Sequence, residues 1–186
     1  MNISFKYPTS FFPPVTTFLL TIQLILFLLT NLIFSKTVSC HICIMNGEWW
    51  RLFTSIFTHK DWHHFLSNCF CLYLLGIQLE KQIGRLRFTT IFFLAGFFGN
   101  IASYLLLPIH YVHSGASGAI FGLFGTQLYT FYMQYELTHK KAVLFFFFIL
   151  FMLLSFTFIN PSANPISHLF GLLTGGLLGV ALTKKQ

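Results

Sequence analysis

Acidic residues are scarce in this sequence of 186 residues, which contains four of them against 26 phenylalanines. Charged residues of both signs make up only 8% of the chain, whereas hydrophobic residues make up 55%. Two stretches, residues 88–135 and 142–183, contain no Asp, Glu, Lys or Arg. A helix crosses a bilayer with about 20 apolar residues, and a soluble domain of this size would expose far more charge. The shortage of charge therefore predicts an integral membrane protein.

Each charge-free stretch is too long for one crossing and is interrupted near its middle by turn-forming residues. Pro108 and Gly115 interrupt the first stretch, and Pro161 and Pro165 interrupt the second. With two further apolar segments, these halves predict six membrane spans, at residues 15–34, 63–79, 88–107, 116–135, 142–159 and 166–182. Because helices satisfy their own backbone hydrogen bonds in lipid, we expect an all-α bundle that forms a single domain over residues 1–186.

The basic residues predict how this bundle is oriented. If the N-terminus lies in the cytoplasm, eight basic residues fall on the cytoplasmic side: Lys6, Lys81, Arg85, Arg87, Lys140, Lys141, Lys184 and Lys185. Only Lys36, Arg51 and Lys60 then fall outside. The positive-inside rule therefore predicts that both termini are cytoplasmic. We attribute the excess positive charge to topology and to contacts with anionic lipid, and we expect no nucleic-acid partner.

Three polar residues stand at the starts of spans that would run from the outer to the inner face. With this orientation, His64, Ser117 and His168 lie at similar depth, just below the outer face. Ser117 is flanked by Gly115, which permits an unusual backbone turn, and by Gly118, which permits close approach of another helix. The alternative is that Ser117 only caps its helix.

Glycines follow His168 on one helical face. They are Gly171, Gly175 and Gly179. A comparable face of the span at 116–135 carries Gly118, Gly122 and Gly125. Two such faces allow close helix packing, which by itself accounts for the pattern. The same packing would also bring the imidazole of His168 to the hydroxyl of Ser117, as a base beside a nucleophile.

His64 and Asn68 are four residues apart and therefore share one face of the second span. An imidazole and an amide both donate hydrogen bonds, which suits a pocket for a developing oxyanion. The alternative is structural, with His64 capping its helix and Asn68 bonding a neighbouring helix. The matching depth of Ser117 and His168 favours the oxyanion pocket.

Missing residues narrow the mechanism further. Asp61 is the only aspartate, which excludes an aspartyl dyad, and no H-E-x-x-H zinc motif occurs. Since no acid lies within the spans near Ser117 or His168, a serine hydrolase here would use a Ser–His dyad without a buried carboxylate. We expect no metal and no cofactor. Cys40 and Cys43 form a C-x-x-C pattern, for which a disulfide stays open.

Four motifs in order resemble those of the rhomboid intramembrane serine proteases in their bacterial six-helix form. They are Trp50-Arg51, the H-x4-H-x3-N pattern from His59 to Asn68, Gly115-Ala116-Ser117-Gly118, and His168-Leu169-Phe170-Gly171. The resemblance runs from Glu48 to about Gly179. Two departures are Phe121, where the family often has a tyrosine, and Glu80-Lys81-Gln82, which lacks the family's arginine.

The resemblance implies an intramembrane serine endopeptidase. Ser117 would be the nucleophile and His168 the general base, while His64, Asn68 and the backbone N–H of Ser117 would form the oxyanion hole. Gly115, Gly118 and Phe121 would support the site. Substrates would be membrane proteins cut in or near a transmembrane segment. The protein would lie in the bacterial inner membrane with its active site towards the periplasm, residues 160–165 capping the site and the span at 142–159 acting as a lateral gate.

Two other functions remain as alternatives. One is a non-catalytic rhomboid-like protein that binds client transmembrane helices, and the other is a small transporter whose polar residues line a path.

Overall fold

The computed structural model describes residues 13–134 and 163–183, and between these ranges residues 144, 147, 148, 150, 151, 155 and 157. The described chain is mostly helical, as expected. Its elements in order are α1 (Pro14–Leu28), α2 (Thr30–Thr37), β1 (Ser39–Cys40), α3 (His41–Met45), α4 (Arg51–Thr54), the 3-10 turn η1 (Ser55–Phe57), α5 (Trp62–Ile83), α6 (Arg85–Leu106), β2 (Val112–His113), α7 (Ser117–Gln134) and α9 (Pro165–Thr183).

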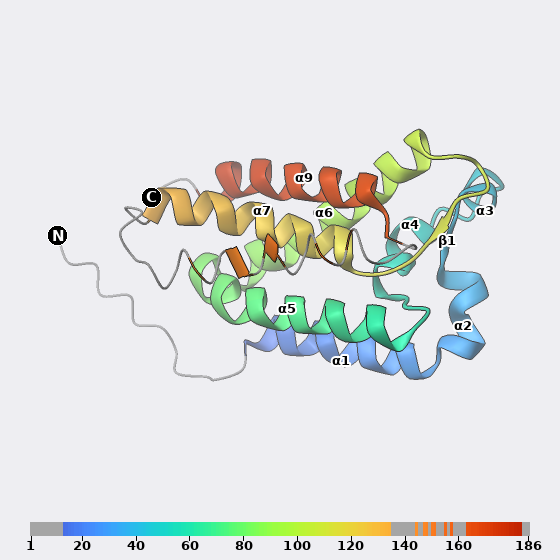
Figure 1. Ribbon diagram of the computed structural model, residues 1–186, viewed down its shortest axis with the longest axis horizontal. Helices are drawn as coiled ribbons and strands as arrows, with labels where there is room; N and C mark the ends of the chain where they lie inside the picture. The colour runs from blue at the N-terminus through green and yellow to red at the C-terminus, as the bar shows by residue number, and fades with distance from the viewer. Residues whose placement is uncertain are drawn as a thin grey trace.

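The long helices α1, α5, α6, α7 and α9 lie roughly along one direction (Figure 1). Helices α5, α7 and α9 all begin at the end of the molecule where α3, α4 and the short strands gather, whereas α1 and α6 run the other way. The core between them consists of large side chains that are almost fully buried, among them Leu72, Leu75, Phe88, Phe92, Ile120 and Leu123. The starts of three helices thus meet at one end of the bundle.

Four of the predicted spans correspond to single helices. The spans at 63–79, 88–107, 116–135 and 166–182 match α5, α6, α7 and α9. By length and composition, α6 and α9 can each cross a membrane unaided, and the bent pair α1 and α2 would add a third crossing within the described part of the chain. Helices α5 and α7 have 22 and 18 residues, but neither reaches the same mean hydropathy within the described residues.

The first predicted span, residues 15–34, is not one straight helix. The chain bends by 102° between α1 and α2. Helix α1 has 15 residues, which corresponds to about 22 Å and is shorter than the hydrocarbon core of about 30 Å. Helix α2 is held against the loop region, because Thr30 Oγ1 donates to the His59 carbonyl at 2.9 Å and Thr54 Oγ1 donates to the Thr37 carbonyl at 2.8 Å. The length of an apolar run can be read from the sequence, but its hydrogen bonds to residues outside the run cannot, so the bend was not predicted.

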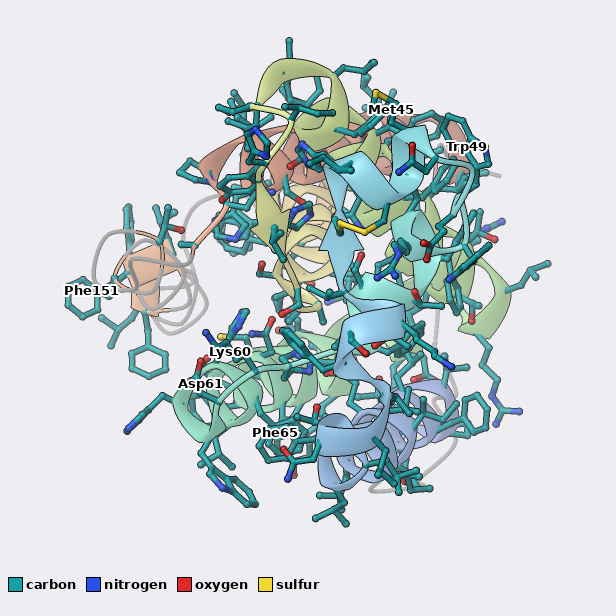
Figure 2. All side chains as sticks on the ribbon, turned by 90° about the vertical axis from the view of Figure 1, so that its right-hand side faces the viewer. Met45, Trp49, Lys60, Asp61, Phe65 and Phe151 are labelled. Atoms are coloured by element: carbon teal, nitrogen blue, oxygen red, sulfur yellow. A yellow bond between two sulfur atoms is a disulfide. The ribbon has the colours of Figure 1, made fainter. Side chains whose placement is uncertain are left out.

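Parts of the prediction fall on residues outside the described ranges. The span at 142–159 is described only at scattered positions, where Phe151 is 64% exposed and points away from the other helices (Figure 2). The expected cap at 160–165 is described only from residue 163. The predicted orientation rests largely on five basic residues that lie outside the described ranges: Lys6, Lys140, Lys141, Lys184 and Lys185.

The loop region contains a short β-ladder and a disulfide. Strands β1 and β2 form an antiparallel two-stranded ladder in which Ser39 faces His113 and Cys40 faces Val112. The all-α prediction missed this ladder because two residues are too short for a periodic signal. Cys40 and Cys43 form a disulfide, seen as a yellow bond in Figure 2.

Glycines make the contact between α7 and α9 unusually close. A Cβ added at Gly171 would collide with the carbonyl of Gly118, and one added at Gly175 would collide with the carbonyl of Gly122. The hydroxyl of Thr126 donates to the Gly175 carbonyl at 2.7 Å across the same contact. The two glycine faces predicted from the sequence therefore do pack together, backbone against backbone.

Two charged side chains in the described part of the chain, Glu80 and Arg51, are buried, and both have partners. The Glu80 carboxylate is 3% exposed and accepts hydrogen bonds from the backbone N–H groups of Val15 and Thr16, at 3.0 and 2.8 Å. It thereby caps the start of α1, where the helix dipole favours a negative charge. Arg51 is 4% exposed and pairs with Glu48 at 2.6 Å.

The α7–α9 contact yields a stability prediction with a neighbouring control. Gly175→Ala should lower the free energy of unfolding by about 1–3 kcal/mol, because its methyl group has no room against α7. Gly176→Ala should be neutral or slightly stabilising, since its Cβ would lie 3.9 Å from the Gly125 carbonyl and alanine favours helix. Thermal unfolding in detergent measures both, and equal transition temperatures would contradict the proposed contact.

Candidate active site

A cavity opens at the end of the bundle where α5, α7 and α9 begin. Its lining comes from these three helices and from the segments that lead into α7 and α9: His64, Ser67, Asn68, Cys71, His113, Ser114, Gly115, Ser117, Ile120, Phe121, Ala163, Asn164, Ser167 and His168. All the site residues predicted from the sequence except Gly118 are among them, and Gly118 follows Ser117 directly.

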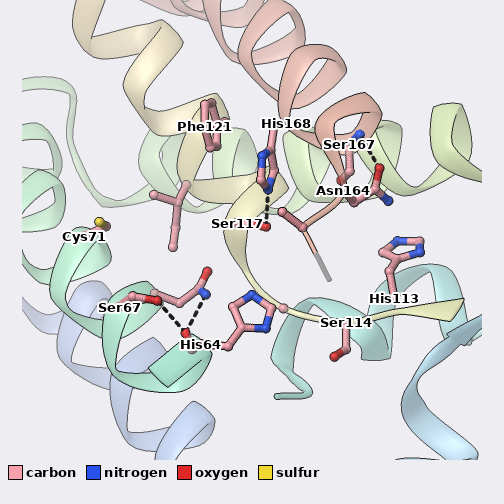
Figure 3. Close-up of a pocket in the computed structure, with 14 residues that line it drawn as sticks. His64, Ser67, Cys71, His113, Ser114, Ser117, Phe121, Asn164, Ser167 and His168 are labelled. Carbon is pink, nitrogen blue, oxygen red and sulfur yellow. Dashed lines mark hydrogen bonds between the residues drawn. The ribbon is translucent and has the colours of Figure 1, made fainter. Parts of the chain in front are cut away.

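Ser117 and His168 are in direct contact. Ser117 is the first residue of α7, and His168 lies in the first turn of α9. The distance from Ser117 Oγ to His168 Nε2 is 2.7 Å, which is a good hydrogen bond (Figure 3). The imidazole is only 5% exposed. The close glycine contact of α7 with α9 makes this short distance possible, because larger residues would hold the two helix starts apart.

An aromatic ring packs flat on the imidazole. Phe121 lies one turn after Ser117 in α7, and its ring stacks on His168 with the centroids 4.4 Å apart and 10° between the planes. Stacking fixes the plane of the imidazole in front of the serine. Phenylalanine does this as well as tyrosine would, but it offers no hydroxyl.

The two glycines beside Ser117 have separate roles. Gly115 has φ +120°, which side chains rarely adopt, and a Cβ there would lie 2.5 Å from Cε1 of His64. Gly118 faces α9, where an added Cβ would lie 2.5 Å from Ser167 Oγ. Gly115 thus lets the chain turn into α7 beside His64, and Gly118 lets α9 approach.

His64 and Asn68 are held on the α5 side of the cavity. Asp61 caps α5 by accepting a hydrogen bond from the His64 backbone N–H at 2.8 Å. Asn68 Nδ2 and Ser67 Oγ both donate to the His64 carbonyl, at 2.7 and 2.9 Å. One hydrogen on Asn68 Nδ2 is left over from this bond. Both predicted oxyanion donors therefore border the cavity that contains Ser117.

A buried polar network fixes the start of α9. Asn100 of α6 donates from Nδ2 to the Leu52 carbonyl at 2.8 Å and accepts at Oδ1 from Nε2 of His113 at 3.1 Å. The Ser167 hydroxyl lies 3.4 Å from the same Oδ1. Asn164 caps α9 by accepting from the Ser167 backbone N–H at 3.0 Å. This network ends at Ser167, one residue before His168. It could not be recognised in the sequence, because Asn100 belongs to none of the four motifs.

Thr157 is a second residue that the sequence analysis missed. Its hydroxyl oxygen lies 2.9 Å from Nδ1 of His168. A threonine within an apolar run carries no signal in the sequence. Only the geometry reveals that it meets the imidazole on the side opposite Ser117.

Histidines in the loop region are buried as neutral groups. Burial, together with the neighbouring His64, lowers the pKa of His59 to about 3. Burial, together with His41 and His168, likewise lowers the pKa of His113 to about 3. Since Nε2 of His113 donates to Asn100, its proton sits on that nitrogen.

Comparison with known proteins identifies the family of this chain. The family model for the rhomboid domain matches residues 46–185. The chain is 37% identical over 180 residues to the rhomboid protein YdcA of Bacillus subtilis (strain 168), which covers 93% of this chain and 90% of YdcA. This chain belongs to the rhomboid family, and with its apolar helices it is a membrane protein.

More distant relatives are longer proteins. Rhomboid protease GluP of Bacillus subtilis (strain 168) is 34% identical over 139 residues, which is 75% of this chain but 27% of GluP. Rhomboid-like protease 1 of Toxoplasma gondii is 32% identical over 146 residues, which is 76% of this chain and 50% of that protein. The match to the rhomboid domain, residues 46–185, includes all the residues that line the cavity.

The buried histidines predict how stability depends on pH. His59 and His113 have a folded-state pKa of about 3 and an unfolded value of about 6.5, so the unfolded chain binds more protons between these limits. Stability is therefore complete above pH 6.5 and falls as the pH drops, by up to about 1.4 kcal/mol per pH unit for each histidine. Unfolding in detergent between pH 7 and 5 measures the slope. His113→Gln should make it shallower, and a flat profile in the wild type would contradict the prediction.

Proposed function

We propose that this protein is an intramembrane serine endopeptidase that cuts transmembrane segments of membrane proteins with a Ser–His dyad. The observation that carries the proposal is the hydrogen bond of 2.7 Å between Ser117 Oγ and His168 Nε2, buried at the end of an apolar bundle. A serine paired with an imidazole is an activated nucleophile. Relatives that are named as proteases support the same reaction.

The dyad performs both halves of the reaction. Nε2 of His168 takes the proton of Ser117 as Oγ attacks the scissile carbonyl carbon, and the imidazolium then returns this proton to the leaving amine. A water molecule then gives a proton to His168 as its oxygen attacks the acyl carbon, and the imidazolium returns this proton to Ser117 Oγ as the bond between Oγ and the acyl carbon breaks. Phe121 holds the plane of the imidazole through both steps.

Three donors would bind the oxyanion of the tetrahedral intermediate. The backbone N–H of Ser117 opens α7, where helix N–H groups have no partner within the helix and the dipole is positive. His64 and the remaining hydrogen of Asn68 Nδ2 border the same cavity from α5. Donors fixed before the reaction stabilise the developing charge without reorganisation.

The membrane arrangement completes the proposal. Residues 1–186 form one domain of six crossings with both termini in the cytoplasm of a bacterial cell. The cavity then lies just below the periplasmic face of the inner membrane, and residues 160–165 cap it. Substrate helices reach it laterally past the crossing at residues 142–159. The helix starts of α5, α7 and α9 at one end of the bundle agree with this common depth.

Covalent labelling tests the nucleophile. A fluorophosphonate probe should label the purified protein, and Ser117→Ala should abolish both labelling and cleavage of a transmembrane substrate. Ser114→Ala is the matched control, because Ser114 lines the same cavity three residues earlier, and it should still be labelled. Labelling that persists in Ser117→Ala would refute the assigned nucleophile. A binding protein without catalysis would show no labelling in any of the three.

A pair of neighbouring variants tests the oxyanion hole. Asn68→Ala should lower kcat about 10²- to 10³-fold with little change in KM, because it removes a donor used only in the transition state. Ser67→Ala removes the other hydrogen bond to the His64 carbonyl but no oxyanion donor, and kcat should stay within a few-fold of the wild type. Equal losses in both variants would mean that Asn68 is only structural.

A further inference from the structure

The imidazole of His168 is held at both of its nitrogens. Nε2 lies 2.7 Å from Ser117 Oγ, and Nδ1 lies 2.9 Å from Thr157 Oγ1. The two hydroxyls come from different parts of the chain, since Ser117 begins α7 and Thr157 precedes His168 by 11 residues in the segment before α9. Serine, imidazole and threonine therefore form one continuous hydrogen-bonded row.

We propose that Thr157 is a positioning residue that acts through His168, as an uncharged third member of the catalytic group. This inference rests on the proposed function. The Nδ1–H of His168 donates to Thr157 Oγ1, which leaves the lone pair of Nε2 directed at the Ser117 hydroxyl. A neutral imidazole carries one ring proton, and its second hydrogen bond decides which nitrogen holds that proton.

Stacking alone cannot select this orientation. The ring of Phe121 lies parallel to the imidazole within 10°, so it fixes the plane of His168. A rotation of the imidazole by half a turn about its last side-chain bond leaves that plane unchanged while it exchanges nitrogens for carbons. A partner at Nδ1 breaks this degeneracy, because only one of the two orientations places Nδ1 at Thr157 Oγ1.

The proton transfer also requires an acceptor at Nδ1. When Nε2 takes the proton from Ser117, His168 becomes an imidazolium with two N–H donors. Nε2 then faces the Ser117 oxygen, while the Nδ1–H group keeps donating its hydrogen bond to Thr157 Oγ1 throughout the step. Proton and charge balance, since Ser117 Oγ gains the bond to the carbonyl carbon and the carbonyl oxygen gains the negative charge. Thr157 itself neither gains nor loses a proton.

A hydroxyl suits this position better than a carboxylate. An isolated ionised carboxylate in an apolar interior carries a large desolvation cost, whereas a hydroxyl carries a small one. The three carboxylates in the described part of the chain are engaged elsewhere: Glu48 with Arg51, Asp61 at the start of α5 and Glu80 at the start of α1. Thr157 supplies a neutral acceptor at the site that a carboxylate holds in a Ser-His-Asp triad.

Three variants distinguish the effect of the Thr157 hydroxyl from the effect of its side-chain volume. Thr157→Val keeps the volume and removes the acceptor, so kcat for a transmembrane substrate and the rate constant of fluorophosphonate labelling should both fall about tenfold, with KM within about twofold. Thr157→Ser restores the hydroxyl and should bring both rates back to within about twofold of the wild type. Thr89→Val is the matched control, because its hydroxyl donates to the Arg85 carbonyl at the start of α6, away from the cavity, and its rates should equal those of the wild type.

Nitrogen NMR of histidine-labelled protein gives a readout that does not depend on turnover. In the wild type, the shifts of His168 should show the proton on Nδ1. In Thr157→Val they should show a mixture of the two tautomers. The wild-type spectrum keeps the inference testable even where Thr157→Val folds poorly, which thermal unfolding would reveal.

The outcomes that overturn this inference differ from those that overturn the proposed function. Wild-type rates in Thr157→Val, rates in Thr157→Ser as low as those in Thr157→Val, or a wild-type proton on Nε2 would each refute the role of Thr157. Ser117-dependent labelling would stand in all three cases. Labelling that survives Ser117→Ala, or that never occurs, would instead refute the proposed protease.

Discussion

The contact of α7 with α9 through their glycines is the constraint on which the candidate site depends. Backbone meets backbone at Gly118 and Gly171 and again at Gly122 and Gly175. In a membrane, apolar side chains gain little from leaving lipid, so close approach and hydrogen bonds hold helices together. The first turns of both helices are brought near enough for the Ser117 hydroxyl to reach the imidazole. Every further feature of the site assumes that this distance is kept.

A second constraint is the cost of polarity in an apolar protein. Several buried polar groups have partners that also serve as anchors. Glu80 caps α1 from the far end of α5, and Asn100 ties the loop region to the start of α9. The dyad follows the same rule, since its imidazole bonds one hydroxyl at each nitrogen. The described side chains that contact the imidazole, Ser117, Phe121 and Thr157, are thus all uncharged.

Much of the fold could be predicted from the sequence, because membrane helices are local structures with a simple apolar signal. The helices α5, α6, α7 and α9 lie where the apolar runs place them. The 102° bend after α1 could not be predicted, since α2 is held by hydrogen bonds to residues 17 and 29 positions away. The β1–β2 ladder was missed for a similar reason, because its two strands are short and Ser39 pairs with His113, 74 positions away.

The sequence by itself determined the membrane class and most of the helices. It also singled out Ser117, His168, His64 and Asn68 as candidate site residues, because residue type and spacing carry that information. Only the tertiary structure decided that Ser117 and His168 touch, that Phe121 stacks on the imidazole, and that Thr157 meets its other nitrogen. These are contacts between segments remote in the chain. Their distances depend on how helices pack, and no local pattern encodes them.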